Sequence, residues 1–133
     1  MANTIPPEVD ALAFEAKLEH CSDSLTQIVE YLRASAQFAG VGVSSRRFRH
    51  PDPNSGWGIT YYTGTAPFCE IHPKAEEEHA WVRLIGVDFG AVEGSGFEAS
   101  NQQGWFKIRE MGEAVRFVRW ILQSHDARTS RAA

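Results

Sequence analysis

The chain has 133 residues, enough for one compact domain whose core can fold without disulfide bonds. Its formal net charge of −4 argues against a dedicated duplex-DNA binder, because phosphate contacts require a basic surface. The amino terminus lacks a secretory signal and no apolar run approaches the roughly 20 residues that span a bilayer, so we expect a cytoplasmic protein with no membrane partner.

The first predicted elements are two helices. Pro6-Pro7 followed by acidic residues is typical of a helix start, and this helix is expected to end near His20. Ser24 and Gln27 form a capping-box pair that begins a second helix, which runs to about Gln37. Apolar residues of the second helix recur at helical spacing and predict one buried stripe: Leu25, Ile28, Val29, Leu32 and Ala36.

Strands follow the two helices. Turn clusters rich in proline, glycine and small polar residues separate β-prone segments at about residues 41–48, 57–63, 68–72 and 79–84. The connections between them are too short for a helical crossover, so we expect antiparallel neighbours.

The segment 87–103 is rich in glycine and small polar residues. It is interpreted mainly as a loop anchored by Phe89 and Phe97, with a short edge strand near residues 97–99. Loops of this length inside small domains are often binding or lid segments, and the alternative interpretation is a passive surface loop.

The last predicted strand, at residues 105–109, leads directly into an amphipathic helix. The apolar residues of this helix predict a buried stripe: Met111, Ala114, Val115, Val118, Ile121 and Leu122. The whole chain is therefore predicted to be a single α+β domain, with a mostly antiparallel sheet of four to five strands, N-terminal helices and this C-terminal helix. Residues 1–6 and 126–133 are expected to be flexible tails.

Two of the predicted strands carry tryptophan and basic side chains on one side only. Successive strand residues point to opposite sides of a sheet. This alternation predicts that four side chains lie on the same side of the sheet, and we call this surface the aromatic-basic face: Trp81, Arg83, Trp105 and Lys107. The same pattern is predicted to add Arg109 and, from the strand at 57–63, Trp57, Ile59 and Tyr61. The opposite side is predicted to be core: Val82, Leu84, Phe106 and Ile108.

From the aromatic-basic face we predict that the chain is a noncatalytic binding module. Indoles stack on planar groups and neighbouring cations attract anions, so the expected ligand is a small anionic or aromatic molecule, or a partner protein. Single-stranded nucleic-acid binders use the same kind of platform, although the net charge disfavours this function. An alternative interpretation covers the face with an N-terminal helix or with the second subunit of a homodimer.

Glu70, His72 and His79 are the candidate acid–base group, and they support the alternative of a small enzyme. The competing interpretation is a structural network of polar side chains between strands. Cys69 lies on the opposite strand side from His72, so we expect it in the core rather than in a Cys–His dyad. The sequence contains no complete metal-binding or cofactor-binding motif, and no metal or cofactor is expected.

Two segments carry a resemblance to a known family: Phe68-Cys69-Glu70-Ile71-His72-Pro73-Lys74 and Leu122-Gln123-Ser124-His125. Over residues 57–125, the chain resembles small bacterial domains of the YdhG and YjbR type, particularly relatives described as predicted transport proteins. These share an F-x-x-I-x-P-K strand and turn, a G-x-aromatic-x-hydrophobic strand, and a helix ending in Gln-Ser-Tyr. Here Arg109-Glu110-Met111 replaces the family's serine cap and His125 replaces the tyrosine. The resemblance implies an α+β fold with a small antiparallel sheet, and it carries over no catalytic residue.

Overall fold

The computed structural model describes residues 14–16, 18–37, 39, 45–52, 56–63, 66–100 and 104–132, without the side chains of residues 45–52, 56, 57 and 129–132. In chain order, the elements are α2 (Asp23–Gln37), β1 (Ser45–Asp52), β2 (Gly56–Thr63), β3 (Ala66–Lys74), β4 (His79–Leu84), α3 (Phe89–Gly94), β5 (Glu98–Ala99), β6 (Trp105–Ile108) and α4 (Met111–Ala132). Helices packed on an antiparallel sheet make this an α+β fold, as the sequence predicts.

The strands form one sheet in the order β1-β2-β3-β4-β6-β5, and every neighbouring pair is antiparallel. Strands β1 to β4 follow one another as hairpins, and the chain then passes through α3 and β5 before β6 pairs with β4. Five strands have four or more residues, which matches the predicted number. The two-residue strand β5 adds the predicted short edge strand.

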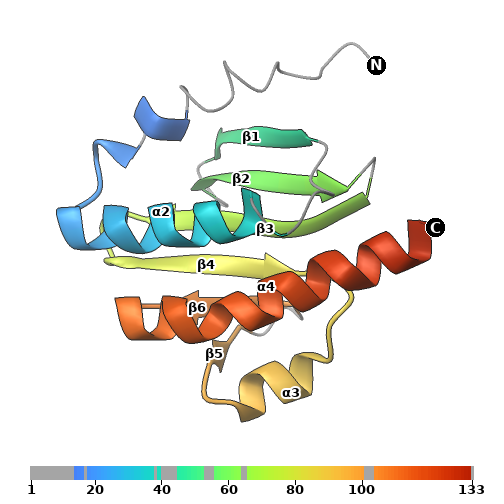
Figure 1. Ribbon diagram of the computed structural model, residues 1–133. Helices are drawn as coiled ribbons and strands as arrows, with labels where there is room; N and C mark the ends of the chain where they lie inside the picture. The colour runs from blue at the N-terminus through green and yellow to red at the C-terminus, as the bar shows by residue number, and fades with distance from the viewer. Residues whose placement is uncertain are drawn as a thin grey trace.

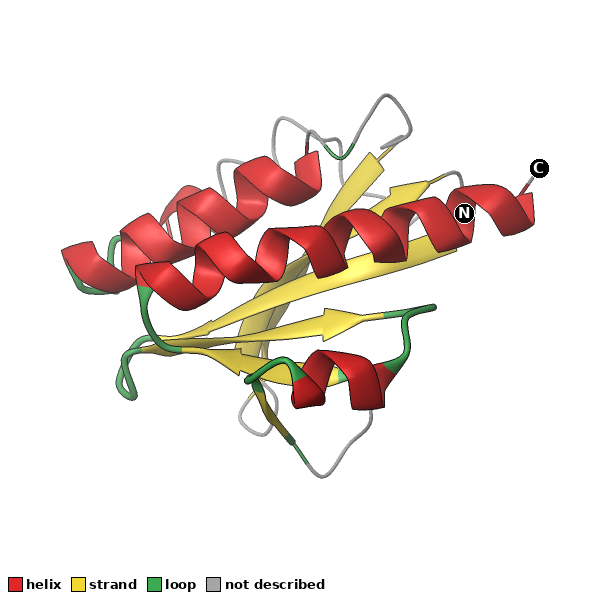
Figure 2. Ribbon diagram, turned by 60° about the horizontal axis from the view of Figure 1, so that its bottom comes forward, coloured by secondary structure: helices red, strands yellow, loops and turns green. Residues whose placement is uncertain are grey.

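Helices α2 and α4 pack side by side on one face of the sheet (Figure 1, Figure 2). Both contact β3, the longest strand, near the middle of the sheet. The small helix α3 lies beside β6, where Phe89 approaches Phe106 with ring centroids 6.4 Å apart. Helices α2, α3 and α4 therefore contribute to the same side of the sheet.

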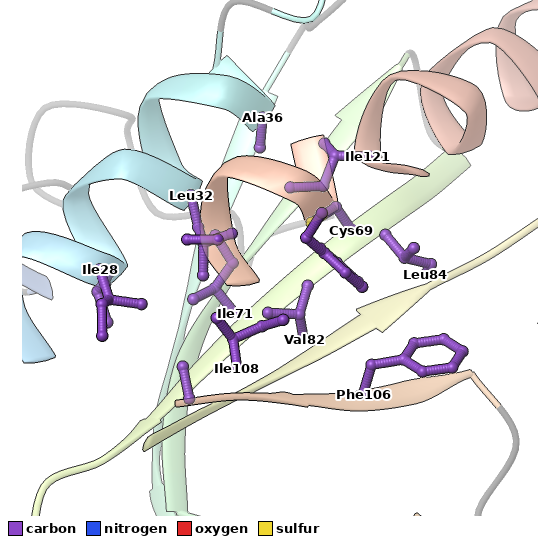
Figure 3. Packing of buried hydrophobic residues seen from close by; sticks show 14 of the residues in the cluster. Ile28, Leu32, Ala36, Cys69, Ile71, Val82, Leu84, Phe106, Ile108 and Ile121 are labelled. Carbon is purple, nitrogen blue, oxygen red and sulfur yellow. The ribbon is translucent and has the colours of Figure 1, made fainter. Parts of the chain in front are cut away.

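One hydrophobic core fills the space between this helix layer and the sheet. Helix α2 contributes Ile28 and Leu32, and α4 contributes Ile121 (Figure 3). The strand residues beneath them are fully buried: Cys69, Ile71, Val82, Leu84, Phe106 and Ile108. The predicted core side of the two tryptophan-bearing strands and the predicted stripe of α2 are thus confirmed.

The start of α2 differs from the prediction. The helix begins at Asp23, and the Ser22 hydroxyl accepts a hydrogen bond from the backbone N–H of Leu25 at 3.1 Å. Ser22 is therefore the capping residue, rather than Ser24. A serine two residues upstream caps equally well because the cap needs only a side-chain oxygen near the first free N–H groups.

Helix α4 is rotated about its axis relative to the predicted stripe. Ala114, Phe117 and Ile121 are fully buried, whereas Val115 is 50% exposed. Met111 and Leu122, also predicted to be core, are 36% and 39% exposed. The rotation follows from Phe117, whose ring packs edge-on against Phe97 at 5.0 Å and beside Phe106 at 5.9 Å. Burying this large ring stabilises the fold more than burying a valine at the neighbouring position.

Helical structure occurs in two parts of the chain that were predicted to be irregular. Residues 126–132, predicted to be a flexible tail, continue α4 to Ala132. No glycine or proline follows Gly112 to interrupt the helix. Ala127 also packs closely on Gly86, because a Cβ added at Gly86 would lie 3.2 Å from the Cβ of Ala127. The segment predicted as a loop contains α3, which the Asp88 carboxylate caps by accepting from the N–H of Ala91. Residues 1–6, the other predicted tail, lie outside the described residues.

Candidate ligand-binding face

Strands β4 and β6 bring the four residues of the aromatic-basic face together, as predicted. Trp81 stands opposite Lys107 in the register, and Arg83 stands opposite Trp105. All four side chains are half-buried. None of the described helices covers them, because α2, α3 and α4 pack on the other side of the sheet (Figure 2).

Strand β2 does not add Ile59 and Tyr61 to this face, and that prediction is wrong. Ile59 pairs with Ile71 and Tyr61 with Cys69, so both point into the core, where they are 0% and 1% exposed. Alternation shows which residues of one strand share a side, but pairing with the next strand decides which side of the sheet that is. The Trp57 side chain lies outside the described residues.

A buried carboxylate stands beside the face, on the neighbouring strand β3. Glu70 on β3 is 5% exposed and pairs with Arg83 in the register. Its Oε2 lies 3.2 Å from Nη1 of Arg83, and its Oε1 lies 3.1 Å from Nε2 of His72. Glu70 therefore holds the guanidinium of Arg83 and the imidazole of His72 in fixed positions beside the two tryptophans.

The His72 ring occupies space that a glycine leaves free. A Cβ at Gly58 would lie 2.6 Å from Cδ2 of His72 and 2.5 Å from the carbonyl oxygen of Ile71. On its other side, the imidazole meets Trp105 edge-on, with ring centroids 4.9 Å apart. The position of His72 is thus set by the missing side chain of Gly58, by Glu70 and by Trp105.

The other tryptophan of the face, Trp81, is contacted by Lys107. Nζ of Lys107 lies 5.3 Å from the Trp81 ring centroid, a cation–π distance, and 3.3 Å from Oε2 of Glu98 on β5. Arg109, just beyond β6, also pairs with Glu98, and it pairs with Glu113 of α4 as well. Glu113 additionally accepts from the backbone N–H of Arg109 at 2.7 Å, so this carboxylate stabilises the start of α4 in place of a serine cap.

Three described cations on this side of the sheet are paired with carboxylates. Arg83, Lys107 and Arg109 each have a carboxylate partner, supplied by Glu70, Glu98 and Glu113. In these described pairs the face presents compensated rather than free positive charge, which attracts a polyanion less strongly. It instead offers indole surface together with the N–H groups of Arg83 that Glu70 does not use, and 42% of the Arg83 side chain is exposed.

His79 lies near the other candidate acid–base residues but in a separate environment. Its ring meets Trp81 edge-on at 5.7 Å, and Nδ1 lies 3.3 Å from the carbonyl oxygen of Glu77. Burial, and then the positive charge of Lys107, lower the pKa of His79 below its ordinary value of 6.5. The structure thus joins Glu70 to His72 and leaves His79 outside this pair.

The lowered pKa of His79 predicts a pH dependence of folding. A histidine that is harder to protonate in the folded state stabilises the fold fully above its unfolded pKa and loses that contribution as the pH falls below about 6.5. In His79→Gln, the difference in the free energy of unfolding between pH 7.5 and pH 5 should be smaller than in the parent protein. Urea denaturation across this range measures it, and an unchanged difference would refute the role of His79.

Cys69 is separated from the polar side chains of the face, as predicted. It is fully buried in the core, and burial raises the pKa of its thiol. A buried thiol with a raised pKa is a poor nucleophile. Within the described part of the chain, no three His, Cys, Asp or Glu side chains gather in an arrangement that could hold a metal ion.

Two residues that shape this face were missed in the sequence. Gly58 interrupts a β-prone segment, and a glycine inside a strand is a signal for close approach of another group. Glu98 falls on the predicted edge strand, and its pairing with Lys107 depends on β5 lying beside β6. The first residue could have been recognised from its local pattern, whereas the second could not.

Comparisons of the chain with protein-family models, with curated protein sequences and with solved structures gave no significant match. The resemblance to domains of the YdhG and YjbR type therefore stays a prediction, and the proposals below rest on geometry. None of the helices in the described ranges is both long enough and apolar enough to cross a membrane.

Proposed function

We propose that the chain is a noncatalytic binding module whose aromatic-basic face binds a small aromatic anion. One observation carries the proposal. Trp81 and Trp105 lie half-buried on adjacent strands, each directly opposite a cation, on a side of the sheet that the described helices leave uncovered. Exposed indoles cost hydration free energy, and a planar ligand that stacks on them recovers it.

The chemistry of the neighbouring groups favours an anion of low charge. Arg83 is fixed by Glu70 yet keeps N–H donors for a carboxylate or phosphate oxygen. Lys107 is engaged with Glu98 and with the Trp81 ring, so it adds local charge rather than a free donor. The pairing of Arg83, Lys107 and Arg109 with carboxylates makes these cations less available to a long polyanion, which weakens the alternative of a single-stranded nucleic-acid binder.

A second candidate function is a small enzyme that uses Glu70 and His72. The contact of 3.1 Å between these side chains supports it, because a carboxylate that orients an imidazole is a common general-base arrangement. Cys69 does not supply a nucleophile to this pair, because it faces the core. A partner protein that covers both tryptophans is the remaining alternative for this face.

Tryptophan fluorescence tests the proposal. The protein is titrated with aromatic carboxylates, nucleoside monophosphates and single-stranded oligonucleotides at low and high salt. We expect saturable quenching by at least one small aromatic anion. Trp81→Ala should weaken this binding by about tenfold or more, because truncating a central aromatic contact costs about 2 kcal/mol.

Trp120→Phe is the matched control, because Trp120 lies on α4, on the helix side of the sheet. Its substitution should leave the affinity unchanged. A flat response to the whole panel, or quenching that Trp81→Ala does not weaken, would rule out the proposed ligand class. Consumption of the ligand during incubation, abolished in His72→Gln, would favour the enzyme instead.

A further inference from the structure

A second surface lies on the helix side of the molecule, away from the aromatic-basic face. A groove of about 440 Å³ runs between α4 and the segment that joins α3 to β5. Its lining residues are Ser95, Phe97, Val115, Arg116, Arg119 and Trp120. Phe97 and Trp120 are only 3% and 7% exposed, so the floor of the groove is apolar and well packed.

Two arginines on α4 stand over this apolar floor. The guanidinium carbon of Arg116 lies 5.1 Å from the Phe97 ring centroid, and that of Arg119 lies 4.8 Å from the Trp120 ring centroid. Among the residues that the structure describes, neither arginine has a carboxylate partner, in contrast to the three cations around the aromatic-basic face. A guanidinium stacked on a ring keeps its N–H edge available, and this edge matches the two oxygens of a carboxylate.

The apolar surface does not end with the groove. Val115 at its rim is 50% exposed, and Met111 and Leu122, which are 36% and 39% exposed, continue along the outer side of α4. Residues at positions 111, 115 and 122 follow helical spacing, so they form one stripe. This surface is open to solvent, which suits a peptide better than a small molecule that must be enclosed.

We infer that this groove binds an acidic peptide segment of a partner protein. An apolar side chain of the segment packs against Val115 at the rim of the groove, and neighbouring Asp or Glu carboxylates pair with Arg116 and Arg119. Charge complementarity identifies the occupant, because two cations that pair with no carboxylate in the described part of the chain, beside exposed apolar surface, select apolar and acidic side chains next to each other. The inference is independent of the ligand proposed for the aromatic-basic face.

Selection from a random peptide display library tests this inference with the intact chain. Peptides that bind should be enriched in an aromatic or aliphatic residue next to Asp or Glu. A synthetic peptide of the enriched sequence should change Trp120 fluorescence. Its affinity should fall about tenfold or more in Arg116→Glu and in Arg119→Glu, because each substitution replaces a charge-assisted hydrogen bond with repulsion.

Lys74→Glu is the matched control, since it makes the same charge change on β3, away from the groove, and it should leave the affinity unchanged. Trp81→Ala should also leave it unchanged, which separates this surface from the aromatic-basic face. Three results would overturn the inference: no enrichment, enrichment that persists in both arginine variants, or a concentration-dependent dimer that Val115→Glu dissociates. The last result would identify a second copy of the chain as the occupant.

Discussion

Replacing Phe117 with alanine should lower the free energy of unfolding by about 3–5 kcal/mol, the usual cost of truncating a fully buried phenylalanine. The Phe117 side chain is 0% exposed and joins Phe97 and Phe106 in one aromatic cluster between α4 and β6. Truncation would leave a cavity at this junction. Urea denaturation followed by far-UV circular dichroism measures the change. If the alanine variant does not fold, Phe117→Leu should show a smaller loss in the same direction.

Val115→Ala is the control on the same helix. Val115 is 50% exposed, so its truncation should change the free energy of unfolding by no more than about 0.5 kcal/mol. The sequence pattern alone predicts the reverse order, because it places Val115 in the buried stripe and leaves Phe117 out. A larger loss for Val115→Ala than for Phe117→Ala would therefore show that α4 is rotated differently from the structure.

The second large effect is expected at Gly58. A Cβ at this position would lie 2.5 Å from the carbonyl oxygen of Ile71, which is backbone, and 2.6 Å from Cδ2 of His72. Gly58→Ala should therefore force β2 away from β3 and displace the imidazole. We expect a loss of about 1–3 kcal/mol, typical of overpacking. Urea denaturation measures the loss, and the nuclear magnetic resonance signals of the His72 ring report its displacement.

Gly94→Ala provides the comparison for Gly58→Ala. A Cβ at Gly94, the last residue of α3, would meet no atom within 4 Å. Alanine is also favoured over glycine in a helix, so this variant should be neutral or more stable by up to about 1 kcal/mol. If Gly58→Ala were equally neutral and left the His72 signals unmoved, the close packing between Gly58 and His72 would be wrong.

These two positions also bear on the proposed ligand. Gly58→Ala disturbs His72, and through it the contacts with Glu70 and Trp105 that organise the aromatic-basic face. Phe117→Ala acts on the opposite side of the sheet. If the face binds a small aromatic anion, the Gly58 variant should lose more affinity than the Phe117 variant under conditions where both are folded.

Local patterns in the sequence determined several features of this protein. The alternation at residues 79–84 and 105–108 placed Trp81, Arg83, Trp105 and Lys107 on one side, and the structure confirms it. The 3.6-residue period placed the core stripe of α2 correctly. Both patterns work because a buried residue and its neighbours belong to one element, whose geometry repeats along the chain.

Only the tertiary structure decided what depends on contacts between elements. Tyr61 points into the core because β2 pairs with β3 in that register, and α4 buries Phe117 because Phe97 and Phe106 meet it from other elements. Glu70 becomes a buried partner of Arg83 and His72 for the same reason. The pattern of a strand or helix shows which of its residues lie on the same side. Which side faces the core depends on the other strands and helices that pack against it. That choice left the two tryptophans uncovered by the described helices and so made the aromatic-basic face a candidate site.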